Sequence, residues 1–177
     1  RYGSSEDAGF SGVVIERGLG LTSFGLVDQN FLNRHRLGRL LVACASQRCS
    51  YGFGLCEESG LVIIGGERRV QAIGRTGVIV AALDTARVQL RPPHFRPDGI
   101  RLNFVEPGCS FHLDTIAADA VDHSGTGLAL LERAIDDLAR DYRATVSSGE
   151  PLYDSEALRA ALLGDDLAEH SPGRADH

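Results

Sequence analysis

Three arginines, Arg34, Arg36 and Arg39, lie close together in the stretch VDQNFLNRHRLGRLL, residues 27–41. An apolar run that ends in polar residues comes before them, and leucines at helical spacing accompany and follow them. In open α/β sheets, ligand sites lie where a strand ends and a helix begins. A helix start is positively charged, and a guanidinium group forms a fork that fits a carboxylate. The stretch therefore predicts a site for an acidic ligand; the alternative is a solvated basic face of the helix.

The elements that would position these arginines are a short strand and the helix after it. FGLVD, residues 24–28, is an apolar run of strand length that ends in a carboxylate. Asn33 is a residue type that favours a helix N-cap. We therefore predict an amphipathic helix over residues 34–46, with Arg36 and Arg39 off its buried stripe. That stripe consists of Leu37, Leu40, Leu41 and Cys44.

The rest of the chain changes from β-rich to helical patterns. Short apolar runs between glycine or charged turns predict strands in YGFGL (51–55), GLVIIGG (60–66), RRVQAIG (68–74), GVIVAAL (77–83), IRLNFV (100–105) and CSFHL (109–113). The Pro-rich segment RPPHFRPDG, residues 91–99, is predicted as a break between them. Helices are predicted from about residue 126 to residue 146 and over residues 155–170.

The bulk composition suits one soluble globular domain. The chain has 177 residues, of which 43% are hydrophobic and 24% charged. No apolar run approaches the roughly 20 residues that cross a bilayer, and no leader opens the chain. We therefore expect a cytoplasmic protein without a membrane partner; the alternative is a protein whose leader is missing from this sequence. The net charge of −6 argues against a nucleic-acid surface. Because the chain starts at Arg1 and contains no Met, we expect a fragment or one chain of a processed protein.

The cysteines do not form a metal-binding pattern. They show neither a C-x-x-C pair nor zinc spacing, and we interpret them as reduced, mostly buried thiols: Cys44, Cys49, Cys56 and Cys109. The glycine-containing segments 18–20 and 64–66 lack the G-x-G-x-x-G pattern of a dinucleotide-binding loop. We therefore expect neither a metal nor another cofactor.

The arginine stretch resembles a segment of the cyanophycinases, a family of serine peptidases. The family's pattern here is G-L-G-L, a short apolar strand, D-Q-H-F, then R-G-R-L-G-R-L. Similar order and spacing occur here in Gly18, Leu19, Gly20, Leu21, Asp28, Gln29, Phe31, Arg34, Arg36, Leu37, Gly38 and Arg39. Further segments that resemble the family are GFGLCEESGLVI, VQAIGRTGVIV and GIRLNFVEPGCSFHL. The resemblance covers roughly residues 12–115.

The resemblance implies a fold, an activity and roles for particular residues. The family has a three-layer α/β/α sandwich of the glutamine amidotransferase-like (flavodoxin-like) type, related to peptidase E. Its members hydrolyse cyanophycin to β-aspartyl-arginine with a Ser nucleophile, a His base and a Glu that orients the His. Glu57 falls at the position of that Glu. The positions that bind the aspartyl substrate are Gln29, Arg34, Arg36 and Arg39.

The resemblance also implies a division of the chain. Residues 1–123 would be the C-terminal part of a cyanophycinase-like domain. Residues 124–165 would form a helical C-terminal extension, and residues 166–177 a disordered tail.

Two departures from the family pattern bear on activity. The family's nucleophile motif, G-T-S-A-G-A, is absent, since Ser4 and Ser5 stand in YGSSED without an elbow glycine. The family's His in D-Q-H-F is Asn30. An amide has no basic lone pair near neutral pH and cannot take the proton of a serine hydroxyl. Loss of a general base slows a reaction by about two to four orders of magnitude, so we expect this chain alone to be inactive.

Two further residues keep alternative interpretations. His35 is a second candidate base, although it would project from the helix start rather than from the strand end. Glu57 is either a member of the triad or, beside Glu58, a polar strand end.

Two hypotheses about function follow. In the first, the chain is the C-terminal part of a serine hydrolase for aspartyl peptides, and the nucleophile belongs to the missing N-terminal half of the domain or to a partner chain. In the second, Asn30 marks a catalytically degenerate relative that binds acidic ligands or regulates. The expected partners are an acidic aspartyl peptide and the missing half of the domain; pairing into a homodimer is left open.

Overall fold

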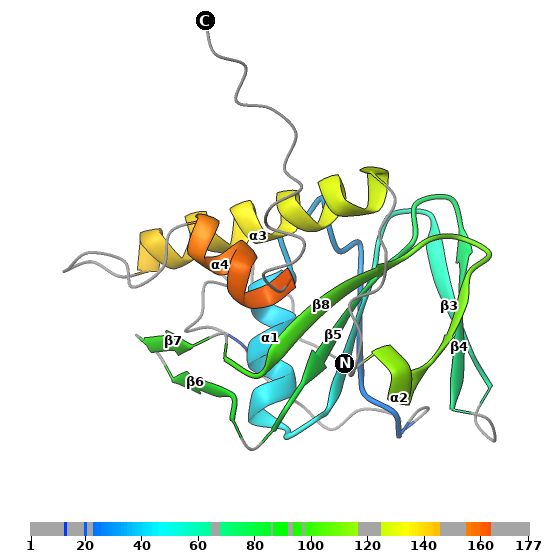
Figure 1. Cartoon of the computed structure of the whole chain (residues 1–177), viewed down its shortest axis with the longest axis horizontal. Coiled ribbons are helices and arrows are strands. Elements are labelled where there is room, and N and C mark those ends of the chain that lie inside the picture. The colour runs from blue at the N-terminus through cyan, green and yellow to red at the C-terminus, as the bar shows by residue number, and fades with distance from the viewer. Residues whose placement is uncertain are drawn as a thin grey trace, which may run out of the picture.

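A four-stranded mixed sheet, in the order β1-β2-β5-β8, forms the centre of the computed structural model (Figure 1). Its strands are β1 (Leu26–Gln29), β2 (Tyr51–Leu55), β5 (Val78–Leu83) and β8 (Ile100–Val105). The structure describes Val13, Gly20 and residues 23–64, 68–85, 87–91, 94–96, 98–116, 125–145 and 155–163. The sheet and its helices confirm the predicted α/β class.

β1 and β2 run parallel, whereas β5 runs antiparallel to both of its neighbours, β2 and β8. Leu26 pairs with Gly52 at one end of β1, and Gln29 pairs with Leu55 at the other. Since the two strands share a direction, their carboxyl ends lie side by side. The segments that follow them, which begin at Asn30 and Cys56, therefore start from the same edge of the sheet.

Helices cover one face of the central sheet. They are α1 (Leu37–Ser46), α3 (Gly125–Thr145) and α4 (Ser155–Leu163), and Figure 1 shows α3 and α4 together over one side. Ile79, Leu102 and Phe104 of the sheet share one buried cluster with residues of all three helices. The helices expected to form an extension thus pack into the same core as β5 and β8.

A smaller sheet covers the opposite face. It has the order β3-β4-β9 and consists of β3 (Ser59–Ile64), β4 (Arg69–Gly74) and β9 (Ser110–His112). Val70 and Ala72 of β4 share a second buried cluster with Phe53 and Val80 of the central sheet. The small sheet's exposed large apolar side chains are Val62, Ile64 and Ile73. The remaining elements are the hairpin β6 (Gln89–Arg91) and β7 (His94–Arg96), and the short helix α2 (Leu113–Ile116).

Two glycines in β2 allow close packing against the sheet. A Cβ on Gly54 would lie 2.5 Å from ring atoms of Phe31, and one on Gly52 would lie 2.8 Å from Cys44 Sγ. Because side chains alternate along a strand, both positions face the helices while Tyr51 and Phe53 face the small sheet. Glycine at these two positions therefore makes room for Phe31 and for α1.

The predicted helix over 34–46 begins later than expected. Its first residue is Leu37, and Arg36 is the N-cap without a side-chain hydrogen bond, so the predicted Asn33 cap is wrong. The backbone N–H of Arg36 bonds to the carbonyl of Phe31, and that of His35 bonds to Leu32, which makes residues 31–35 a turn. The predicted buried stripe of leucines and Cys44 is confirmed.

Elsewhere the strands agree with the sequence patterns to within two residues at either end. The exception is the Pro-rich break, which contains part of the β6–β7 hairpin. The predicted tail over residues 166–177 lies outside the residues that the structure describes. Within the described helices, none is both long and apolar enough to span a membrane.

Candidate functional site

Asp28 is the buried centre of the region at the end of β1. It is 7% exposed, and the apolar residues Leu26 and Val27 precede it in the strand. An ionised carboxylate is costly to bury unless it is paired and hydrogen-bonded. Arg36 and Arg39 supply that pairing, so the carboxylate links the end of β1 to the start of α1.

The two arginines bind Asp28 in different ways. Arg39 donates from Nε to Oδ2 at 2.9 Å and from Nη2 to Oδ1 at 2.6 Å, which is a bidentate fork. Arg36 donates from Nη1 to Asp28 Oδ1 at 3.0 Å and to the Gln29 carbonyl at 2.7 Å. The Gln29 backbone N–H also donates to Oδ1, at 2.9 Å. Two guanidinium groups therefore surround one carboxylate, and the cluster keeps one net positive charge.

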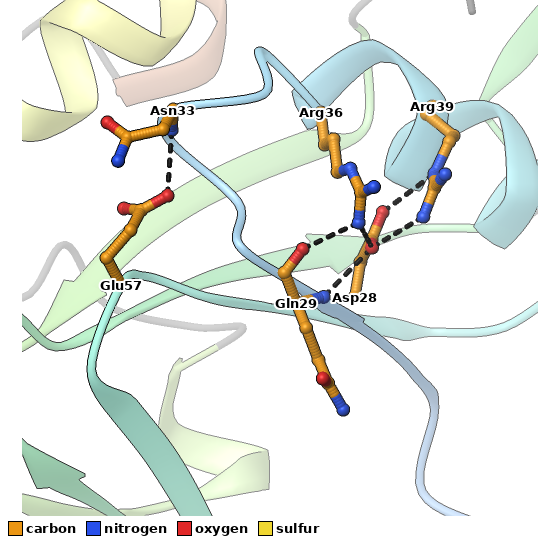
Figure 2. A network of polar contacts seen from close by, with 6 residues as sticks. All are labelled: Asp28, Gln29, Asn33, Arg36, Arg39 and Glu57. Carbon is orange, nitrogen blue, oxygen red and sulfur yellow. Dashed lines mark hydrogen bonds and ion pairs between the residues drawn. The ribbon is translucent and has the colours of Figure 1, made fainter. Parts of the chain in front are cut away.

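Gln29 and Arg34 lie apart from this cluster as side chains. Figure 2 shows Asp28 pointing toward the two arginines and the Gln29 side chain pointing away from them. This follows from the alternation of side chains along a strand. Arg34 is exposed and lies in the turn before α1. Of the four residues expected to bind substrate, the structure joins Arg36 and Arg39 through Asp28, and it leaves Gln29 and Arg34 on the surface.

Glu57 lies next to the turn that precedes α1. Its Oε1 accepts a hydrogen bond from the Asn33 backbone N–H at 2.9 Å (Figure 2). Ser59 fixes the backbone after β2, since its Oγ donates to the Glu57 carbonyl at 3.3 Å and accepts from Gly77 N at 2.8 Å. The carboxylate therefore binds a backbone amide of the turn and holds that turn beside the end of β2.

Asn30 follows β1 directly and has a left-handed backbone, with φ of 49°. Asn is one of the few non-glycine residues that adopts this conformation readily. Its side chain is exposed. The residue at the expected base position thus lies at the surface, at the edge where both parallel strands end.

His35 pairs with a residue that the sequence analysis did not single out. Its Nδ1 lies 2.6 Å from Oδ2 of Asp137, a residue of α3 whose side chain is 8% exposed. Arg140 Nη1 contacts the other oxygen of Asp137 at 3.0 Å. Among the described residues Asp137 Oδ2 makes no hydrogen bond, so this contact is an ion pair only when the imidazole is protonated, and Nε2 is the ring nitrogen that points away from the carboxylate. The imidazole ring of His35 is 45% exposed.

The thiols do not form a reactive centre at this edge. Burial, with a smaller contribution from the charge of Glu57, raises the pKa of Cys56 to about 12. Burial also raises the pKa of Cys44 far above its ordinary range. All four cysteines are free; Cys44 and Cys56 are buried, whereas Cys109 is exposed. Among the residues that the structure describes, no group of three or more metal-ligating side chains occurs.

Asp28 and Asp137 are the two polar residues of this region that sequence reasoning missed. The sequence did hold a signal for Asp28, because a carboxylate that ends an apolar strand needs a cation, and three arginines follow within 11 residues, of which Arg36 and Arg39 bind it. Asp137 had none, because it stands 102 residues after His35 in a helix rich in charged residues.

Known proteins similar to this chain are cyanophycinases. The chain is 33% identical over 119 residues to the cyanophycinase of Trichormus variabilis, a match that covers 63% of this chain and 39% of that protein. The cyanophycinase of a Nostoc species matches to the same extent. The chain thus spans well under half the length of these relatives. No family model matches the chain.

This similarity agrees with the resemblance read from the residues. It also fits a flavodoxin-like, glutamine amidotransferase-like form of the α/β fold that the structure shows. The further relation to peptidase E stays a prediction. The chain is therefore an α/β protein similar to part of the cyanophycinases.

Proposed function

We propose that this chain is the C-terminal part of a cyanophycinase-like, serine-type hydrolase of aspartyl peptides. The observation that carries the proposal is the 33% identity to cyanophycinases over 119 residues. The substrate would be an acidic peptide, and its carboxylate would be attracted by the positive charge that remains on the cluster of Asp28, Arg36 and Arg39. The exposed guanidinium of Arg34 would add to that attraction.

The nucleophile would come from residues outside this chain's matched region. β1 has a described partner, β2, on one side only. In our proposal, the N-terminal half of the domain pairs with the other side of β1 and brings its serine to the carboxyl ends of β1 and β2. The reaction would be acyl transfer to water, with the oxyanion held by backbone N–H groups near the nucleophile.

The general base is the one catalytic group of this reaction that the resemblance does not supply. Asn30 cannot accept a proton, and Glu57 binds the Asn33 amide rather than an imidazole. If the full-length protein is a hydrolase, we propose that His35 is the general base, with its Nδ1 beside Asp137. In the second candidate function, favoured by Asn30, the site binds acidic peptides without cleaving them.

One assay separates these functions. The full-length gene product is incubated with cyanophycin, and the release of β-aspartyl-arginine is measured for the wild type and for Asn30→His, Glu57→Gln and His35→Gln. A hydrolase that uses His35 loses at least a hundredfold in rate in His35→Gln. An inert wild type that gains activity in Asn30→His is a binding protein whose triad lacks its base.

Hydrolysis by the wild type that His35→Gln leaves unchanged contradicts the role of His35. No release by any variant, together with no binding of β-aspartyl-arginine, contradicts the proposed substrate class.

A further inference from the structure

A second pair of arginines lies at the opposite end of the same two strands. Arg48 and Arg68 line an open cavity of about 370 Å³, together with residues at the amino ends of β1 and β2. β1 spans four residues, so at about 3.3 Å per residue the cavity lies roughly 10 Å from the carboxyl ends. The site is separate from the one on which the proposed function rests.

Arg48 occupies a backbone position that normally selects glycine. It follows α1 and has φ of 52°. The N–H of Cys49 bonds to the Cys44 carbonyl at 2.9 Å and that of Arg48 bonds to the Ala45 carbonyl at 3.2 Å, which is the Schellman pattern of a helix end. A left-handed residue with a side chain costs about 1–2 kcal/mol relative to glycine. An arginine held there suggests that its side chain has a use.

Arg68 also has a left-handed backbone and lines the cavity. It precedes β4 with φ of 50°, and its guanidinium lies 6.0 Å from the ring centre of Phe24, which also lines the cavity. Its Nη2 donates to Asp114 at 2.8 Å, so one carboxylate offsets one of the two guanidinium charges. None of the described residues that line the cavity is acidic, so its described walls carry a net positive charge.

The other walls suit a small organic anion. Ser23 and Ser50 bring hydroxyl groups that can donate to oxygen atoms, and Phe24 and Leu26 bring apolar surface. The volume lies within the range of about 300–1,000 Å³ that is usual for small-molecule sites. Guanidinium forks beside hydroxyl donors are typical of carboxylate and phosphate recognition.

We propose that the cavity between Arg48 and Arg68 binds a small organic anion, a carboxylate or a phosphate ester. Arg48 and Arg68 supply the positive charge, Phe24 beside Arg68 supplies an apolar wall, and Ser50 donates a hydrogen bond. A ligand there would contact β1 and β2 at the ends opposite to the candidate catalytic edge. The cavity is thus a second binding site, independent of whether the first one cleaves peptides.

The test is a titration of the protein with sodium benzoate and, separately, with inorganic phosphate, at constant ionic strength maintained with sodium chloride. The amide NMR signals of Arg48, Cys49 and Ser50 report on the cavity. We expect saturable shifts with at least one anion, and the anion that saturates identifies the carboxylate or the phosphate class. Arg48→Gly is expected to weaken binding at least tenfold, while Arg75→Gln, which removes an 81% exposed arginine elsewhere, leaves it unchanged.

Because glycine is the preferred residue in this conformation, Arg48→Gly should fold at least as well as the wild type. Shifts that never saturate, or that sodium chloride alone reproduces, overturn the proposal. Equal binding by Arg48→Gly and the wild type also overturns it.

Discussion

The two ends of the parallel pair β1 and β2 each carry two arginines, but they use them differently. At the carboxyl end, Arg36 and Arg39 are at most 15% exposed and share the buried carboxylate of Asp28. At the amino end, Arg48 and Arg68 line an open cavity, and both have left-handed backbones. The comparison teaches that a carboxylate of the chain itself takes up part of the charge of an arginine pair, so that the arginines of the open cavity are the more accessible to a ligand.

The largest expected effect comes from removing the internal anion. Asp28→Ala leaves two largely buried guanidinium groups without their carboxylate, so we expect the free energy of unfolding to fall by about 3–5 kcal/mol. Urea unfolding followed by circular dichroism measures this loss. The matched control is Glu58→Gln, which breaks an exposed ion pair with Arg75 and should change stability by less than about 1 kcal/mol. Equal losses in the two variants would show that Asp28 does not anchor the arginines.

An effect of opposite sign is expected at the other end. Arg48→Gly relieves the left-handed strain, and the greater freedom of glycine in the unfolded chain offsets part of that gain. We expect a net stabilisation of up to about 1 kcal/mol, measured by the same urea unfolding. The control is Gln47→Gly one residue earlier, where φ is −94° and glycine should destabilise. A destabilised Arg48→Gly would mean that its side chain contributes to folding rather than to ligand binding.

The smallest expected effect concerns the alkylation of two thiols, one near each end of the parallel pair β1 and β2. Cys49 lines the cavity and Cys56 is buried after β2. Burial raises the pKa of both thiols, that of Cys56 to about 12, so thiolate forms only as the pH rises through these raised values. We expect iodoacetamide at pH 9 to label exposed Cys109 first, Cys49 slowly and Cys56 only after unfolding, as mass spectrometry can show. Saturating the cavity with its anion should slow Cys49 alone; labelling of Cys56 in the folded protein would contradict the burial.

Local patterns predicted most of the elements because each pattern lies within one segment. The period of Leu37, Leu40 and Leu41 indicates α1, and short apolar runs between turns indicate the strands. The start of α1 was misplaced because Asn33 bonds to Glu57, 24 residues away, and no local signal reports that contact.

The sites depend on contacts that the sequence does not display. Arg36 and Arg39 follow Asp28 at 8 and 11 residues, and they meet it only because the chain reverses between β1 and α1. The cavity draws its walls from three separate segments. The end of α1 at Ser46 was predicted correctly even though Arg48, and not the usual glycine, occupies the left-handed position that follows it.

The contact between Phe31 and Gly54 has a consequence for how sequences of this kind can diverge. The ring occupies the space that any side chain at position 54 would need, at 2.5 Å from the Cβ position. The two positions therefore vary as one unit, and the order of substitutions matters. A lineage can shorten Phe31 first and then acquire a side chain at Gly54, while the reverse order passes through a protein that cannot pack its turn against β2. Among relatives, we expect a residue larger than glycine at position 54 only where position 31 has lost its aromatic ring.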